Sequence, residues 1–561
     1  MIRNAGRAFF ALGSVVFAAL MATWVEAQTT QAVSTIKSST ELVLVPVVIN
    51  DKSGDHISGL KKEDFILKQD GNRQTISVFE EVKTDSSRLH RSSEQGTFTN
   101  FEPDRSSYHR LSVIVLDLVN TPFSDQASAR TGLVKFLSDV ADSGEPMCLL
   151  EFTSSGLTVL QDFTDDPKRL ASALSKAKSG GAPMTYERIT DPHHPVDGPL
   201  AAALTAMIRG DLQSEAQLAS LQTKTAVSLT VQALQQIAKS LRGLPGRKSL
   251  IWASSGFPFS LSPSTSSAED SEMPVHHGDE VRALYDNLWK IMNDAQIAIY
   301  SVDLRSTTAS PPIFEGGVRP SDIGDPQFDL DAQAKAERAD TTTTLQLFAE
   351  NTGGRAFLGG SNLVESFRQA VKDDSSYYVI GYYVGSDTKP GWHPISLTAT
   401  RKGARLRYRN GFLRSTDTSS GSALAEMQLA LTSPFDFEGM PVSIRWTGRE
   451  AGKSPGKIKV QFELVLPANF ASVDEADQNH MIIDIAALAK NARGEVIADL
   501  TQRVDTHLKP EGLEQIQRNG MTYRNGLQLP PGDYSVRFVV RDSLAHRIGS
   551  VAAPVSVTAA P

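Results

Sequence analysis

The fold is decided by the stretch Leu111-Ser-Val-Ile-Val-Leu-Asp117-Leu-Val-Asn120-Thr121. It is a short apolar run that ends in a carboxylate, and a turn and a helical pattern follow it. The first strand of a parallel α/β sheet places an acidic residue in this way at its carboxyl end, where ligands and metals bind. The sequence therefore raises the question of whether Asp117 holds a divalent cation.

Strands and helices alternate around this stretch, from residue 109 to residue 384. Between 226 and 242, apolar residues recur at steps of three and four, which predicts an amphipathic helix with one buried face. Apolar runs that predict strands lie at 111–116, 147–152, 157–163, 248–254, 297–302 and 377–384. This order of elements predicts an α/β core with a doubly wound, mostly parallel sheet.

Segments with a β pattern flank this core on both sides. We expect a small N-terminal β unit at 40–83 and a linker at 84–108, which is rich in Ser, Arg and Glu. A β annex of the core follows at 385–415. Strands separated by turn residues then recur from 425 to 558, which predicts a C-terminal β-sandwich.

Charge and targeting signals limit the possible functions. The 561 residues carry a formal net charge of -8 without a basic face, which argues against nucleic-acid binding. Arg3 and Arg7 precede an apolar run that ends in small residues, so residues 1–27 are expected to be a secretory signal peptide. The alternative is a retained anchor. We expect export to the periplasm, the cell envelope or the medium, with no membrane span after the signal is removed, and Cys148 as the single cysteine excludes an internal disulfide.

Four stretches give the chain a resemblance to a known family. They run from Gly59 to Gly71, from Leu111 to Thr121, from Pro245 to Pro258, and from Thr352 through Tyr382 to Phe412. Through these stretches, residues 40–415 resemble the secreted acidobacterial type of von Willebrand factor type A domain proteins, and the last domain is similar to immunoglobulin-like sandwiches.

The resemblance implies a divalent-cation site, for Mg²⁺ or Mn²⁺, at the carboxyl ends of the strands. The family motif is Asp-x-Ser-x-Ser, joined by a Thr from a second loop and an Asp from a third. Hydroxyl, carboxylate and water oxygens suit such a cation, and an open position accepts a partner's carboxylate. The positions of this chain that correspond to ligands are Asp117, Asn120, Thr121 and Thr185.

The motif is degenerate in this chain. Val119 replaces the first Ser and cannot coordinate, and Ser254 and Ser255 stand where the family has its third-loop acid. The alternative to metal binding is that Asp117 caps the turn or the following helix. In both cases we expect a partner protein to bind over this edge of the sheet, at loops 117–126, 178–200 and 254–280, with Ser254 and Ser255 among the contacts.

The function predicted from these observations is that of an exported, non-enzymatic protein-interaction or adhesion module. The sequence has no Gly-x-Ser-x-Gly, His-Glu-x-x-His or phosphate-binding loop. One alternative is a structural component of the envelope that uses its β domains for assembly. The other is a secreted hydrolase in which His193-His194 or His276-His277 works with Ser254, Ser255 or Asp303. No cofactor beyond the cation is implied.

Overall fold

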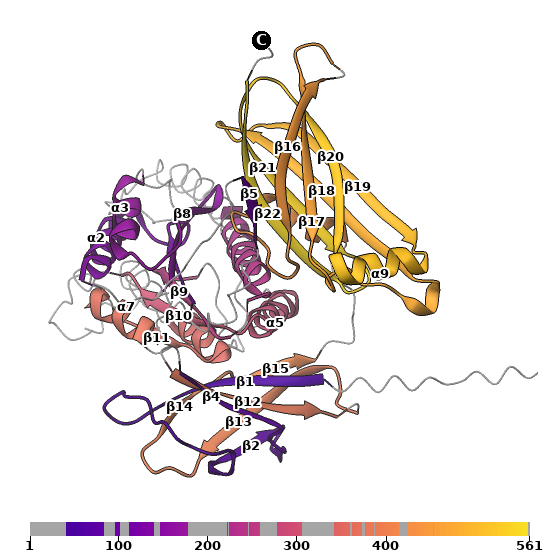
Figure 1. Ribbon diagram of the computed structural model, residues 1–561. Helices are drawn as coiled ribbons and strands as arrows, with labels where there is room; N and C mark the ends of the chain where they lie inside the picture. The colour runs from indigo at the N-terminus through magenta and orange to yellow at the C-terminus, as the bar shows by residue number, and fades with distance from the viewer. Residues whose placement is uncertain are drawn as a thin grey trace, which may run out of the picture.

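The structure is a computed structural model, and its described residues form three units (Figure 1). An N-terminal β unit and a C-terminal pair of sheets lie beside a central sheet that is covered by helices. The signal peptide expected at 1–27 and Thr185 lie outside the described residues. The described residues are 41–83, 96–100, 111–139, 146–177, 221–257, 278–305, 342–359, 362–372, 376–414 and 423–558, without 223, 245, 386 and 453.

The central unit is built on a six-stranded sheet with the order β11-β10-β9-β6-β7-β8. Neighbouring strands are parallel, except that β8 runs antiparallel to β7. Successive side chains of β6 point to opposite faces, and both sets are apolar, as expected for a strand buried on both sides. The strands are β6 (Leu111–Asp117), β7 (Met147–Thr153), β8 (Gly156–Thr164), β9 (Lys248–Ser254), β10 (Ile297–Asp303) and β11 (Arg355–Phe357).

Helices cover both faces of this sheet. On one face pack α2 (Phe123–Asp139), α3 (Pro167–Lys176) and α7 (Leu363–Lys372), and Phe136 of α2 stacks on Phe367 of α7 with ring centroids 5.3 Å apart. The other face is covered by α5 (Gly278–Asp294) and by the helical residues at 224–241 and 342–352. The helix at 224–241 agrees with the one predicted at 226–242.

The N-terminal unit consists of two four-stranded sheets, β14-β1-β12-β4 and β15-β13-β2-β3, around one apolar core. The run at 377–384, which we expected in the central sheet, is β12 of this unit, and Val43 of β1 pairs with Tyr382. The strands are β1 (Glu41–Asn50), β2 (Phe65–Gln69), β3 (Asn72–Arg73), β4 (Val78–Lys83), β12 (Ser376–Val384), β13 (Gly391–Ala399), β14 (Arg405–Arg407) and β15 (Gly411–Arg414), with a short turn of helix, η1 (Lys62–Asp64).

The C-terminal unit is two antiparallel sheets, β20-β17-β16-β5 and β19-β18-β21-β22, that enclose a shared apolar cluster with Phe462, Ile485 and Phe538. The strand β5 (Thr97–Thr99) comes from the segment expected to be a linker. The other elements are α8 (Ala423–Thr432), β16 (Ser443–Ala451), β17 (Ile458–Leu466), η5 (Glu475–Asp477), β18 (His480–Asn491), β19 (Val496–His507), α9 (Pro510–Asn519), β20 (Met521–Leu529), β21 (Gly532–Asp542) and β22 (Arg547–Val557).

Buried contacts join the two outer units to the central one. The Tyr377 hydroxyl accepts a hydrogen bond of 3.0 Å from the backbone N–H of Arg247, at the amino end of β9. Phe435, which precedes the C-terminal sheets, is part of the central apolar core. The backbone of Glu438 runs so close to Gly243 that a Cβ there would meet the Glu438 carbonyl oxygen at 2.1 Å. Only glycine fits at this contact.

The fold class predicted from the sequence is wrong for the chain. Four of the five sheets among the described residues are antiparallel, and the fifth is mixed. Strand residues also outnumber helical ones in the described ranges, so the protein is mostly β rather than a doubly wound α/β protein. The prediction failed because it classed the whole chain by its central segment, whereas the β units on either side of that segment supply most of the strands of the described residues. Among the described residues, no helix is long and apolar enough to span a bilayer.

Candidate functional site

The carboxyl ends of the central strands form one edge of the sheet, which we call the rim: the ends of β6, β9, β10 and β11 and the residues that directly follow them. Asp117 ends β6 here and is fully buried. Its Oδ1 accepts backbone N–H groups from Val119 at 3.0 Å and from Asn120 at 2.9 Å. Its Oδ2 accepts from the Asn120 amide at 2.8 Å and from the Trp252 indole at 3.1 Å, and it lies 2.9 Å from the Ser254 hydroxyl.

The other predicted site residues belong to the same buried network. Thr121 accepts a hydrogen bond from the backbone N–H of Ser255 at 3.2 Å, and the Ser255 hydroxyl donates to Asp125 at 3.2 Å. Asn120 also donates to Thr230 at 3.0 Å, which ties the helix at 224–241 to the end of β6. The structure thus brings together all the predicted site residues that it describes.

Burial raises the pKa of Asp117 to about 6, while the donors from Asn120, Ser254 and Trp252 act in the opposite direction. The Ser254 hydroxyl lies 2.6 Å from the Gly256 carbonyl oxygen as well as 2.9 Å from Asp117. Because a hydroxyl carries a single proton, it can donate to only one of these two acceptors. The other donors to the Asp117 carboxylate are all N–H groups.

This donor set does not fit a hard cation. Mg²⁺ and Mn²⁺ need oxygen ligands with available lone pairs, but both Asp117 oxygens already face N–H donors. The Thr121 hydroxyl oxygen likewise accepts an N–H group. Of the predicted ligand atoms at Asp117, Asn120 and Thr121, Asn120 Oδ1 is the one that is buried without a hydrogen-bond partner, and one amide oxygen does not make a site. The network matches the alternative in which Asp117 organises the turn.

The predicted partner contacts Ser254 and Ser255 are also buried, with 0% and 6% of their surface exposed. They lie in the buried interior of the rim and do not form its exposed surface. Their side-chain bonds run to Asp117, Gly256 and Asp125. This geometry gives the hydrolase alternative no support, and His193-His194 and His276-His277 lie outside the described residues.

Asp303, at the end of β10, is held by its own partners. Arg305 donates from Nε to Oδ1 at 2.8 Å and from a terminal nitrogen to Oδ2 at 2.7 Å, which makes a bidentate pair. The backbone N–H of Arg305 donates to Oδ1 at 3.0 Å, and the backbone N–H of Gly359, in the turn after β11, donates to Oδ2 at 3.3 Å. Arg305 also reaches the Thr342 hydroxyl at 2.8 Å. These bonds lock neighbouring parts of the rim together.

Two large apolar side chains are exposed on this braced rim. Phe123, in the first turn of α2, exposes 67% of its surface, and Leu358, just after β11, exposes 40%. Phe123 lies where the chain enters α2 after the end of β6, and Leu358 lies between β11 and α7. The helices α2 and α7 pack against each other. Exposed aromatic side chains on a rigid support are typical of protein-binding surfaces.

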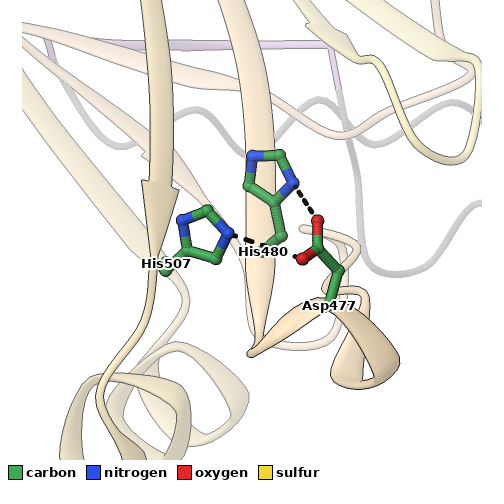
Figure 2. Close-up of side chains that lie close together, drawn as sticks. All are labelled: Asp477, His480 and His507. Carbon is green, nitrogen blue, oxygen red and sulfur yellow. Dashed lines mark hydrogen bonds and ion pairs between the residues drawn. The ribbon is translucent and has the colours of Figure 1, made fainter. Parts of the chain in front are cut away.

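A second group of candidate side chains, which could hold a metal ion, lies in the C-terminal unit (Figure 2). Asp477, His480 and His507 point toward one another, with their possible ligand atoms within 4.8 Å. His480 Nδ1 lies 3.0 Å from Asp477, and its Nε2 lies 2.8 Å from Asp505. These residues were not predicted from the sequence, because the two histidines are 27 positions apart and meet only through the pairing of β18 with β19.

Comparisons with known proteins add no family. No protein-family model matches the chain, and no curated protein does. Among solved structures, it is similar to a glycosyl hydrolase family 2 member from Bacteroides cellulosilyticus, with a TM-score of 0.16 and 10% identity over 32% of this chain and 20% of that one. For a β-glucuronidase from Bacteroides uniformis, the TM-score is 0.14, with 10% identity over 32% and 19%. The chain thus spans about a fifth of these enzymes, and the likeness carries no functional argument.

Proposed function

We propose that the protein is an exported, non-enzymatic protein-binding module that recognises its partner with the rim of the central sheet. The observation that carries this proposal is the 67% exposure of Phe123 beside a buried network that holds the rim in one conformation. A surface that is ordered before binding loses little conformational entropy when a partner docks. Export is proposed from the apolar segment with small residues at its end, within residues 1–27.

The proposed contact centres on Phe123 and extends to Leu358. An aromatic ring with most of its surface in water releases that water when it enters a partner's pocket, and such anchors dominate binding energies. Arg305, with 22% of its side chain exposed, supplies a polar neighbour that is already oriented by Asp303. The partner is therefore expected to offer an apolar pocket, and binding is expected to need no divalent cation.

The test is capture of the partner from the native cell envelope with purified protein and with Phe123→Asp. We expect one partner to be retained by the wild type, with or without a chelator, and its affinity to fall at least tenfold with Phe123→Asp. The matched control is Leu424→Asp, which changes a side chain 65% exposed on α8 of another unit. Equal capture by Phe123→Asp and the wild type would show that the rim is not the binding surface.

A further inference from the structure

We propose that Asp477, His480 and His507 form a transition-metal site, with Zn²⁺ as the ion of matching chemistry, at one end of the C-terminal sheets (Figure 2). The site is separate from the rim and does not depend on the proposed function. It combines two imidazoles with a carboxylate, the donors that Zn²⁺ accepts in three-ligand sites. Mg²⁺ and Ca²⁺ prefer oxygen ligands and do not match.

Strand pairing places the two histidines. His480 begins β18 and His507 ends β19, and the register of the antiparallel pair sets them directly opposite each other. Side chains opposite each other in such a pair leave the sheet on the same face. The two rings are stacked, with centroids 4.4 Å apart and planes inclined by 5°. Two protonated, positively charged rings would repel each other in this position, whereas two neutral rings can share one cation.

A rigid turn brings the carboxylate to the histidines. Asp477 ends η5, whose start is capped by the Asp474 side chain through the backbone N–H groups of Ala476 and Asp477, at 3.0 and 3.4 Å. The backbone of Asp474 pairs with that of His480 through two hydrogen bonds of 2.9 and 3.1 Å. The turn between them uses left-handed residues at Gln478 and Asn479. The carboxylate is thus fixed relative to the start of β18.

The distances leave room for an ion after small rotations of the side chains. The Asp477 oxygens lie 3.0 Å from His480 Nδ1 and 3.7 Å from His507 Nε2. Ligands that sit about 2.0–2.2 Å from a tetrahedral Zn²⁺ are roughly 3.3–3.6 Å apart. The Asp477 carboxylate therefore already has nearly the required separation from both imidazoles.

Asp505 supplies the support that metal-bound histidines need. Its Oδ1 lies 2.8 Å from Nε2 of His480, so the Nε2–H group donates a hydrogen bond to the carboxylate. The lone pair of Nδ1 is then available on the side of Asp477. This carboxylate–histidine–metal arrangement fixes the imidazole tautomer at zinc sites. In a protein without metal, the same distances would require a doubly protonated His480 between two carboxylates.

The fourth coordination position is open to solvent. Asp477 and His507 expose 58% and 51% of their side chains, and His480 exposes 18%. Water, or a side chain of a bound protein, can complete the shell from outside. The site thus has the composition of an accessible three-ligand zinc centre rather than of a closed structural one.

The test is calorimetric titration of the full chain with ZnCl₂. We expect the wild type to bind one more equivalent of Zn²⁺ than His507→Gln or His480→Gln, each of which should weaken this site at least 100-fold. Asp505→Asn should weaken it about tenfold, as loss of a supporting carboxylate does. MgCl₂ should give no heat at this site.

Asp499→Asn is the matched control, because Asp499 is an exposed carboxylate on β19 and lies six positions before Asp505, which puts both side chains on one face. It should bind Zn²⁺ like the wild type. Circular dichroism checks that His507→Gln, at an exposed position, is folded. If His507→Gln and His480→Gln both bind the same number of Zn²⁺ ions as the wild type with the same affinity, the proposal is wrong. A wild type that gives no binding heat with Zn²⁺ would overturn it equally.

Discussion

The indole Nε1 of Trp252 donates a hydrogen bond of 3.1 Å to Oδ2 of Asp117 across two neighbouring parallel strands. Both residues are fully buried. The bond joins the ends of β6 and β9, and it fills a position on the carboxylate that a cation would need. Asp117 is therefore expected to contribute to the stability of the rim.

Asp117→Asn should destabilise the protein by about 2–4 kcal/mol, because the new amide group would direct N–H groups at donors that now face an oxygen. Urea unfolding at pH 7.5 measures the change. Asp499→Asn, at an exposed carboxylate, should unfold at the wild-type urea concentration. Titrations of the wild type and Asp117→Asn with Mg²⁺ or Mn²⁺ should give the same heats. If Asp117→Asn had wild-type stability, and if the wild type gave a heat of Mg²⁺ binding that this variant lacked, Asp117 would be a cation ligand after all.

Lys248 makes stability depend on pH. Burial lowers the pKa of Lys248 to about 7, against an opposing effect of Glu438, and its ammonium donates to the Leu244 carbonyl oxygen at 2.6 Å. Between pH 7 and pH 10.5 the unfolded chain binds more protons at this residue than the folded one, so stability rises with pH in this window. Below pH 7 the cost of the buried charge is present in full.

Lys248→Met should remove this dependence. The unfolding free energy of the wild type minus that of the variant should rise by about 1.4 kcal/mol per pH unit above pH 7, or about 3 kcal/mol by pH 9. Urea unfolding of both proteins between pH 6 and pH 9 measures the difference. For Lys290→Met, which changes a partly exposed lysine paired with Asp294, the difference should be flat. A flat profile for Lys248→Met as well would mean that Lys248 keeps an ordinary pKa.

Asn100 fastens the segment of β5 to the C-terminal unit. Its amide donates to the carbonyl oxygens of Phe437 at 2.6 Å and Met440 at 2.9 Å, and its Oδ1 accepts the N–H of Val442 at 2.7 Å. Asn100→Ala leaves these buried groups without partners and should cost about 2–4 kcal/mol. Hydrogen exchange should show the loss of protection in β5 and at the start of β16.

Asn100→Asp distinguishes these bonds from a general effect of burial. The aspartate keeps an acceptor for Val442 but places a second oxygen against the carbonyl groups of Phe437 and Met440. It should therefore be at least as destabilising as Asn100→Ala. If Asn100→Asp were as stable as the wild type, the two donated bonds would contribute nothing.

Gly243 should tolerate no side chain. In Gly243→Ala the methyl group would lie 2.1 Å from the Glu438 carbonyl oxygen, so the backbone must move apart. Overlap of this kind typically costs about 1–3 kcal/mol. The comparison is Gly512→Ala in the exposed helix α9, where the nearest atom to a Cβ is 3.9 Å away, and a gain of about 0.4–1 kcal/mol is expected. Equal thermal midpoints for the two variants would contradict the close contact.

Local patterns predicted many of the elements but few of their partners. The apolar run at 377–384 has the composition of a buried parallel strand, yet it pairs antiparallel with β1 from the far end of the chain. Periodicity reports which face of a strand is apolar and carries no information about its neighbour. For the same reason β5 was not predicted: its three residues lie in a polar segment, and they form a strand by pairing with β16.

The sequence likewise predicted some residues of the candidate sites and not others. Reasoning from strand ends predicted that Asp117 and Ser254 share one edge, and the structure places their side chains 2.9 Å apart. How completely Trp252 and the turn at Val119 satisfy the hydrogen-bonding capacity of the carboxylate could not be predicted from the sequence. His480 and His507 could not be paired in advance, since the register of β18 against β19 follows from packing across the whole sheet.

The strands near the amino end are completed by segments that are synthesised far later. Asn100 accepts a hydrogen bond from the backbone N–H of Val442, 342 residues further on, and the backbone N–H of Leu60 donates to the hydroxyl of Tyr378, 318 residues further on. The first sheet therefore cannot close while the nascent chain is short, whereas the central sheet can assemble from segments between β6 and β11. We therefore expect an inside-out order of folding, in which the middle of the polypeptide folds first, the N-terminal unit is completed once β15 has been synthesised, and the C-terminal unit is completed after β22.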